Sequence, residues 1–257
     1  MREVLVKSKA LLFDLDGTLI RGEEAIPGAT SFVRELVNLG KKIVYLTNNA
    51  TRTKQAVSAL LAGLGFPATP DMVLTSSVTA AALLTRKIGT GKKVYVIGEE
   101  GLRQPLLAAG FVLAEDDDLS VHAVVMGLDR NVTYLHFEKA VRHIYAGAVF
   151  MATNLDRVIP VQGGFAPGAG SLVALVKTAT GVNPLLAGKP SADFVNEALL
   201  LADVSREEAI LIGDNPDTDI LAAKNAGVFS ILIESGVPSD ENIFPDLQVH
   251  SLADLLN

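Results

Sequence analysis

Two aspartates, Asp14 and Asp16, stand two residues apart just after the apolar run from Val4 to Phe13, and Gly17 and Thr18 follow them directly. Acids this close repel one another, and burial at a strand end strengthens the repulsion, so a compensating charge is required. Three later stretches carry further polar side chains, namely Thr47-Asn48-Asn49, Gly188-Lys189-Pro190 and Gly213-Asp214-Asn215, with Asp217 and Asp219 beyond the last. The residue types therefore indicate a cluster of acids with one lysine and one hydroxyl.

A divalent cation would make the clustered carboxylates tolerable, and an all-oxygen ligand set favours Mg²⁺ over zinc. Lys189 and Thr47 beside these acids require an anion, and a phosphate between the cation and the lysine satisfies every group. One carboxylate can then act as a nucleophile, while the second protonates the leaving oxygen and later activates water. The pattern predicts phosphoryl transfer, which needs mainly positioning and neutralisation of charge.

Each polar stretch also has a purely structural interpretation. The first could be a turn, Thr47-Asn48-Asn49 a helix cap, and Gly188-Lys189-Pro190 a loop. Asp214, Asp217 and Asp219 could favour a helix N-terminus through the helix dipole. The joint pattern favours a site, because all four stretches follow expected strands or precede expected helices.

Short apolar segments alternate along the chain with segments of helical periodicity, which predicts a parallel α/β sheet with helices on both faces. In such sheets ligands bind at the carboxyl ends of the strands. The expected strands are 9–13, 42–46, 93–97, 123–126, 149–152, 210–212 and 230–233. The expected helices are 27–39, 54–64, 101–109, 134–145, 170–180, 192–201 and 217–226.

Two changes of composition interrupt this order. Residues 75–90 are rich in Ala, Thr and Ser before a new strand–helix–strand pattern starts at Lys93, and QGGFAPGAGS at 162–171 is expected to be a long Gly/Pro loop. We therefore expect a core domain formed by 1–77 and 179–257, with a second α/β domain inserted at 78–178.

The overall composition bounds the class of protein. Hydrophobic residues make up 49% and charged residues 20% of the 257 residues, which is typical of a globular chain. A net charge of -7 argues against a nucleic-acid partner. The absence of cysteine excludes disulfides, thiolate metal sites and cysteine nucleophiles. We find neither a signal peptide nor a membrane span in the sequence, and therefore expect a soluble cytoplasmic protein without a membrane partner.

The four motifs FDLDGT, LTNN, GKP and GDNPDTDI, in this order, resemble those of the haloacid dehalogenase superfamily. The finer resemblance is to its NagD-type, or 4-nitrophenylphosphatase-like, branch, whose additional patterns are similar to Asp16–Ala29 and Ala152–Leu172. This resemblance implies a Rossmann-like core with an α/β cap inserted between the second and third motifs, and a Mg²⁺-dependent phosphatase activity.

The resemblance also implies a role for each matching residue. Asp14 would be the nucleophile that becomes an aspartyl-phosphate and a metal ligand, and Asp16 the general acid/base whose backbone carbonyl also meets Mg²⁺. Asp214 would be the third metal ligand, supported by Asn215 and Asp219. The transferring phosphate would be bound by Thr47, Asn48, Asn49 and Lys189.

Asp16 favours hydrolysis of a phosphate ester, because a leaving oxygen must be protonated. A large cap favours a small phosphorylated metabolite as substrate. Two alternatives stay open: a phosphotransferase or mutase that uses the same intermediate, and a phospho-accepting signalling module. The resemblance also allows a homodimer formed through the cap.

Some further side chains have two interpretations. Asn154 and Asp156 follow an expected strand and either contact substrate or form a turn, and Arg52 either reaches an anion or lies exposed on a helix. His136 and His143 are seven residues apart and are expected on a helix surface.

Overall fold

The computed structural model describes residues 3–115, 118, 120–235 and 243–255. The chain forms two compact units. The first comprises Met1–Thr47, Lys54–Leu74 and Lys189–Asn257, and the second comprises Asn48–Thr53 and Thr75–Gly188. The second unit reaches beyond the expected range 78–178 at both ends and also includes the short segment after Thr47.

The first unit is built on a six-stranded sheet in the order β15-β14-β13-β1-β4-β5. The pairs that join β15, β14, β13, β1 and β4 are parallel. The strands are β1 (Ala10–Asp14), β4 (Lys42–Thr47), β5 (Val73–Thr75), β13 (Ala209–Gly213), β14 (Phe229–Ile233) and β15 (Leu247–Val249). Every residue of β1 and β13 is buried, as expected for strands that are covered on both faces.

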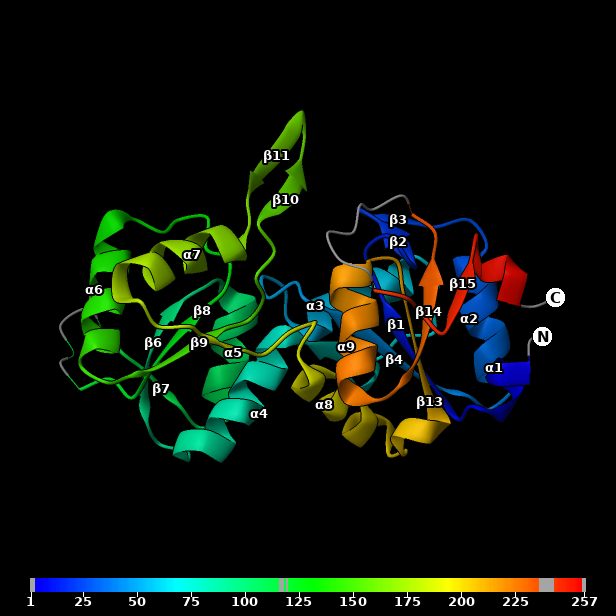
Figure 1. Cartoon of the computed structure of the whole chain (residues 1–257), viewed down its shortest axis with the longest axis horizontal. Helices are drawn as coiled ribbons and strands as arrows, with labels where there is room; N and C mark the ends of the chain where they lie inside the picture. Colours follow the sequence, from blue (N-terminus) through cyan, green and yellow to red (C-terminus); the bar gives the residue numbers. More distant parts are fainter. Residues whose placement is uncertain (1–2, 116–117, 119, 236–242, 256–257) are drawn as a thin grey trace. The chain divides into compact units, whose positions relative to one another are not determined.

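Helices pack on the sheet of the first unit (Figure 1). The buried strands β1 and β13 supply the apolar side chains on which they pack. Leu11 and Phe13 of β1 belong to a core cluster that also contains residues of α1 (Glu3–Lys7), α2 (Ala29–Asn38) and α3 (Lys54–Gly63). Elsewhere, α8 (Ala192–Ala202) packs against β4 and against α9 (Leu221–Ala226). A short hairpin, β2 (Ile20–Arg21) with β3 (Glu24–Ala25), follows β1.

Single helical turns complete the first unit. Among the described residues, 3₁₀ turns lie at Pro70–Met72, Arg206–Glu208 and Leu252–Leu255, and Pro216–Ile220 is a π-helical turn between β13 and α9. The helix expected at 217–226 is therefore divided into this turn and α9.

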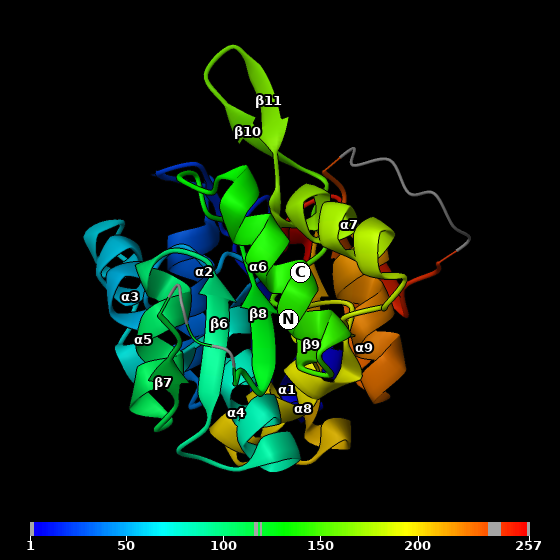
Figure 2. The ribbon, with the colours of Figure 1, turned by 90° about the vertical axis from the view of Figure 1, so that its left-hand side faces the viewer.

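The second unit contains its own sheet in the order β12-β9-β8-β6-β7, with parallel pairs throughout (Figure 2). Its strands are β6 (Lys93–Ile97), β7 (Val112–Leu113), β8 (Ala123–Met126), β9 (Val149–Ala152) and β12 (Leu185–Leu186). One face packs on α4 (Ser76–Ile88) and α5 (Glu100–Ala108), and the other on α6 (Tyr134–Tyr145) and α7 (Ala169–Thr180). The mixed α/β class with parallel sheets is confirmed.

Two local predictions are wrong. The expected loop at 162–171 contains β11 (Gly164–Pro167), which pairs antiparallel with β10 (Val158–Val161). The reversal between them is formed by Gln162 and by Gly163, whose φ is 85°. His143 is buried, since it lies on the inner face of α6 with its ring 5.2 Å from that of Tyr95. Burial lowers the pKa of His143.

Within the part of the chain that is described, none of the helices has the length and apolar character that crossing a bilayer requires.

Candidate active site

Three expected site residues of the first unit, Asp14, Thr47 and Asp214, lie at the carboxyl ends of three adjacent strands. Asp14 is the last residue of β1, and its partner in β4 is Leu46, so that Thr47 is the next residue along β4. Asp214 directly follows β13, the other neighbour of β1. Parallel pairing in this register brings the ends of the three strands to one edge of the sheet.

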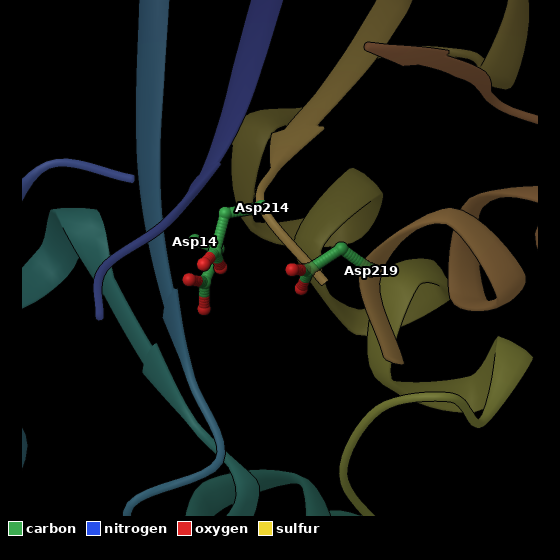
Figure 3. Close-up of side chains that lie close together, drawn as sticks. All are labelled: Asp14, Asp214 and Asp219. Carbon is green, nitrogen blue, oxygen red and sulfur yellow. The ribbon is translucent and has the colours of Figure 1, made fainter. Parts of the chain in front are cut away.

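Three carboxylates meet at this edge. Oxygens of Asp14, Asp214 and Asp219 lie within 4.8 Å of one another, and all three residues are buried. Figure 3 shows the carboxylates turned toward a shared space. Asp219 comes from the π-helical turn. The side chain of Asp16 is exposed and is not one of this group.

Lys189 supplies the buried positive charge of the cluster. Only 3% of its surface is exposed, and its ammonium forms ion pairs with Asp14 and, at 2.6 Å, with Oδ1 of Asp219. The hydroxyl of Thr18 donates to Oδ2 of Asp14 at 3.4 Å. Lys189 and Asp14 are 175 positions apart in the chain, so the fold alone brings them into contact.

The electrostatics of the cluster are unbalanced. Burial, together with the charge of Asp219, raises the pKa of Asp14 well above its usual range and the pKa of Asp214 to about 6. Burial by itself would lower the pKa of Lys189. The negative charges of Asp14 and Asp219 outweigh this effect, so the pKa of Lys189 is raised. Three buried carboxylates against one ammonium leave an excess of negative charge, and a hard divalent cation fits these oxygen donors.

Two glycines allow the backbone to approach these acids closely. A Cβ on Gly17, whose φ is +90°, would lie 2.1 Å from Oδ2 of Asp214. A Cβ on Gly213 would lie 2.3 Å from the Cγ of Asp219. Asp219 is also held by the backbone N–H of Asn215, which donates to its Oδ2 at 3.1 Å. The chain beside Asp16 is therefore packed directly on the Asp214 carboxylate.

Asn48 and Asn49 belong to the second unit. The side-chain oxygen of Asn49 accepts hydrogen bonds from the N–H and the hydroxyl of Thr51, at 2.9 and 2.7 Å. The backbone carbonyl of Asn48 accepts from Ser76 and from Asn154. Sequence reasoning gave Ser76 no role, because a serine within a Ser/Thr-rich stretch carries no distinguishing signal.

The remaining candidates have local partners. The side chain of Asn215 accepts from the N–H of Asp217 at 2.9 Å and so caps the π-helical turn. The side-chain oxygen of Asn154 accepts from the N–H of Asp156 at 3.1 Å, as the turn interpretation expects.

Comparisons with known proteins agree with this geometry. The sequence pattern of the haloacid dehalogenase-like hydrolases matches residues 11–112, and a second pattern of HAD-like hydrolases matches 186–255. An acid sugar phosphatase of Staphylococcus saprophyticus is 38% identical over 235 residues, which cover 91% of this chain and 90% of that protein.

Solved structures resemble the whole chain. The p-nitrophenyl phosphatase of Archaeoglobus fulgidus superposes with a TM-score of 0.89 at 30% identity, covering 97% of this chain and 98% of that one. A glycerol phosphate phosphatase of Mycobacterium tuberculosis, solved in complex with magnesium, gives a TM-score of 0.91 at 35% identity over 99% of this chain and 78% of that one. This chain is thus an enzyme of the hydrolase class, and it belongs to the haloacid dehalogenase-like hydrolases, in the branch that contains the p-nitrophenyl phosphatases.

Proposed function

We propose that the protein is a Mg²⁺-dependent phosphomonoester hydrolase that acts on small phosphorylated metabolites through an aspartyl-phosphate on Asp14. The observation that carries this proposal is the buried contact of Asp14 with Lys189, next to the carboxylates of Asp214 and Asp219. It combines a carboxyl nucleophile, an ammonium group for the transferring phosphate and an oxygen-rich metal site. The activities named for the relatives support the same class of reaction.

Asp14 and Asp214 are proposed as metal ligands, with the backbone carbonyl of Asp16 as a third. The contact between Gly17 and Asp214 supports this set, because it brings the backbone beside Asp16 next to a ligand carboxylate. The bound cation would offset the excess negative charge and draw electron density from the phosphate oxygens.

In the first step an oxygen of Asp14 attacks phosphorus, the bond from phosphorus to the ester oxygen breaks, and Asp16 gives its proton to the departing alcohol. In the second step Asp16 takes a proton from water, whose oxygen attacks phosphorus and releases inorganic phosphate from Asp14. Lys189 lowers the pKa of Asp14, although burial and the charge of Asp219 raise that pKa by more, and so favours the ionised form of the attacking oxygen. Thr47, Asn48 and Asn49 are proposed to hold the phosphate.

The test is steady-state release of phosphate from 4-nitrophenyl phosphate, with and without Mg²⁺. We expect turnover by the wild type with Mg²⁺, loss of it after chelation, and loss in Asp14→Asn, which keeps the shape of the side chain. Asp217→Asn is the matched control, since Asp217 lies in the π-helical turn but outside the carboxylate cluster. An Asp14→Asn enzyme as active as Asp217→Asn would contradict the proposal.

The intermediate has a separate test. In Asp16→Asn the second step should become slow, because no base activates the water, while 4-nitrophenolate still leaves without a proton. Rapid mixing should then show a burst of 4-nitrophenolate equal to the enzyme concentration. Turnover without a burst, at the same slow rate from the first cycle onward, would argue against an accumulated aspartyl-phosphate.

A further inference from the structure

Lys189 reaches the carboxylate cluster from a turn, outside any helix or strand. Its ammonium contacts Asp14 and Asp219, while its backbone lies in the short turn that precedes α8. Lys189 opens the last segment of the first unit, so the residue before it belongs to the second unit. Within the first unit the chain continues from Lys189 only toward Pro190 and α8, and the place of its backbone depends on what holds that side.

On that side Asn225 donates a hydrogen bond to the turn. The side-chain amide nitrogen of Asn225 lies 2.9 Å from the carbonyl oxygen of Pro190. Proline has no backbone N–H, so this carbonyl is the only hydrogen-bonding group of its main chain. Asn225 belongs to α9, which packs against α8, the helix that follows the turn. The donor is therefore carried by a helix that is itself fixed.

Few rotations separate this hydrogen bond from Lys189. The pyrrolidine ring restricts φ of Pro190, and the peptide group between Lys189 and Pro190 is planar. Rotation about ψ of Pro190 would turn its carbonyl oxygen away from Asn225. While the hydrogen bond is formed, the Cα of Lys189 therefore keeps its place relative to α9.

The same stretch of chain holds the other end of Lys189. Asp219, six positions before Asn225, binds the ammonium through its Oδ1 at 2.6 Å. Because a lysine side chain is long and flexible, the contact with Asp219 alone does not fix where the ammonium lies relative to Asp14. The hydrogen bond from Asn225 supplies a second fixed point, next to the backbone of the lysine.

We propose that Asn225 is a positioning residue that fixes the backbone of Lys189 so that its ammonium binds the phosphate of the substrate. Asn225 lies outside the four motifs, since the last of them ends at Ile220. All the groups concerned belong to the first unit. This inference rests on the proposed phosphatase function and extends it to one residue of α9.

The experiment compares Asn225→Ala and Asn225→Leu with the wild type, using 4-nitrophenyl phosphate as substrate and inorganic phosphate as inhibitor. Neither replacement can donate to the carbonyl of Pro190, and the exposed position of Asn225 accommodates both. Asn38→Ala is the matched control, because Asn38 is likewise an exposed asparagine at the end of a helix of the first unit, α2.

One net hydrogen bond corresponds to a change of about two- to tenfold in an equilibrium constant. We expect the inhibition constant of phosphate to rise about two- to fivefold in both Asn225 variants, with a similar rise in KM and a smaller change in kcat. The Mg²⁺ concentration at half-maximal activity should stay the same, because Asn225 acts on Lys189 and not on the proposed metal ligands. Alanine and leucine are better helix formers than asparagine, which offsets the lost bond, so the melting temperature should change little.

The outcomes separate the two proposals. An active wild type whose phosphate inhibition is unchanged in both Asn225 variants would overturn the positioning role and leave the phosphatase function intact. A rise in only one of the two variants would also overturn it, because the effect would then follow the size of the side chain and not the lost donor. An equal rise in Asn38→Ala, or a parallel rise in the Mg²⁺ requirement, would overturn it as an effect that is not specific to Lys189. A wild type without turnover on phosphate esters would overturn the function and the inference together.

Discussion

Gly17 offers a sharp test of how the backbone supports the carboxylate cluster. Alanine at this position would carry two separate costs. Its φ of +90° is unfavourable for any residue with a Cβ, at about 1–2 kcal/mol. In addition, its Cβ would lie 2.1 Å from Oδ2 of Asp214, where ordinary contacts begin at 3.4 Å. The carboxylate or the loop must therefore move by about 1 Å, a displacement that can cost about 10²-fold in rate.

Gly22 separates the two costs. Its φ is +63°, but nothing lies within 4 Å of where its Cβ would be, so Gly22→Ala carries the backbone cost alone. We expect Gly22→Ala to lose about 1–2 kcal/mol of unfolding free energy, which corresponds to a melting temperature lower by roughly 2–8 °C, and Gly17→Ala to lose more, because the contact with Asp214 adds to the backbone cost. Only Gly17→Ala should also lose about 10²-fold in kcat/KM and require more Mg²⁺ for half-maximal activity.

The assay is a Mg²⁺ titration of 4-nitrophenyl phosphate hydrolysis beside thermal unfolding of each variant. If Gly17→Ala and Gly22→Ala lost the same stability and shared one Mg²⁺ requirement, the close approach to Asp214 would have no bearing on the metal site. The same reasoning would fail if Gly22→Ala were the variant with the altered Mg²⁺ requirement.

Three further predictions concern the acids. Asp16→Asn should lower kcat/KM far more for glycerol phosphate than for 4-nitrophenyl phosphate, because an alkoxide needs a proton to leave; equal losses would exclude Asp16 as the acid. The raised pKa of Asp214 means that the native carboxyl keeps a proton that the unfolded chain has lost, so the metal-free protein should lose stability as pH rises from about 4 to above 6. Mg²⁺ competes with that proton, so its stabilising shift in melting temperature should grow over the same range; a shift independent of pH would refute this. Asp219→Asn removes a charge that raises the pKa of Asp214, so the midpoint of this loss of stability should move to lower pH. An unchanged midpoint would contradict the effect assigned to that charge.

The sequence predicts the sheets and the strand-end residues well, for a physical reason. Strands such as β1 and β13 are buried on both faces and so appear as continuous apolar runs, and a charged residue directly after such a run marks the carboxyl edge. Asp14 and Asp214 could be placed in this way. Lys189 could be placed only through the motif order, because it follows no strand of the core sheet.

Other features depend on contacts that periodicity does not report. Asp219 reaches the cluster because a π-helical turn replaces the first turn of the expected helix, and the sequence gives no sign of this change. The hairpin of β10 and β11 lacks the alternation of a half-buried strand, since all of its strand residues are exposed or only partly buried. His143 could not be assigned to the inner face of α6 from its spacing to His136 alone. Ser76 is found only through the carbonyl that it contacts.

The pairing of β1 with β13 has a consequence for how the chain acquires its structure during synthesis. Ala10 pairs with Ala209, so the centre of the core sheet cannot form until the last part of the chain has emerged. At translation rates of about 5–20 residues per second, β1 waits roughly 10–40 s for this partner. The second unit is complete at Gly188, so that it can fold in the last roughly 1–4 s of that interval. A nascent chain therefore exposes the apolar strands β1 and β4 while its inserted unit is already folded, and in this window we expect it to depend most on chaperones.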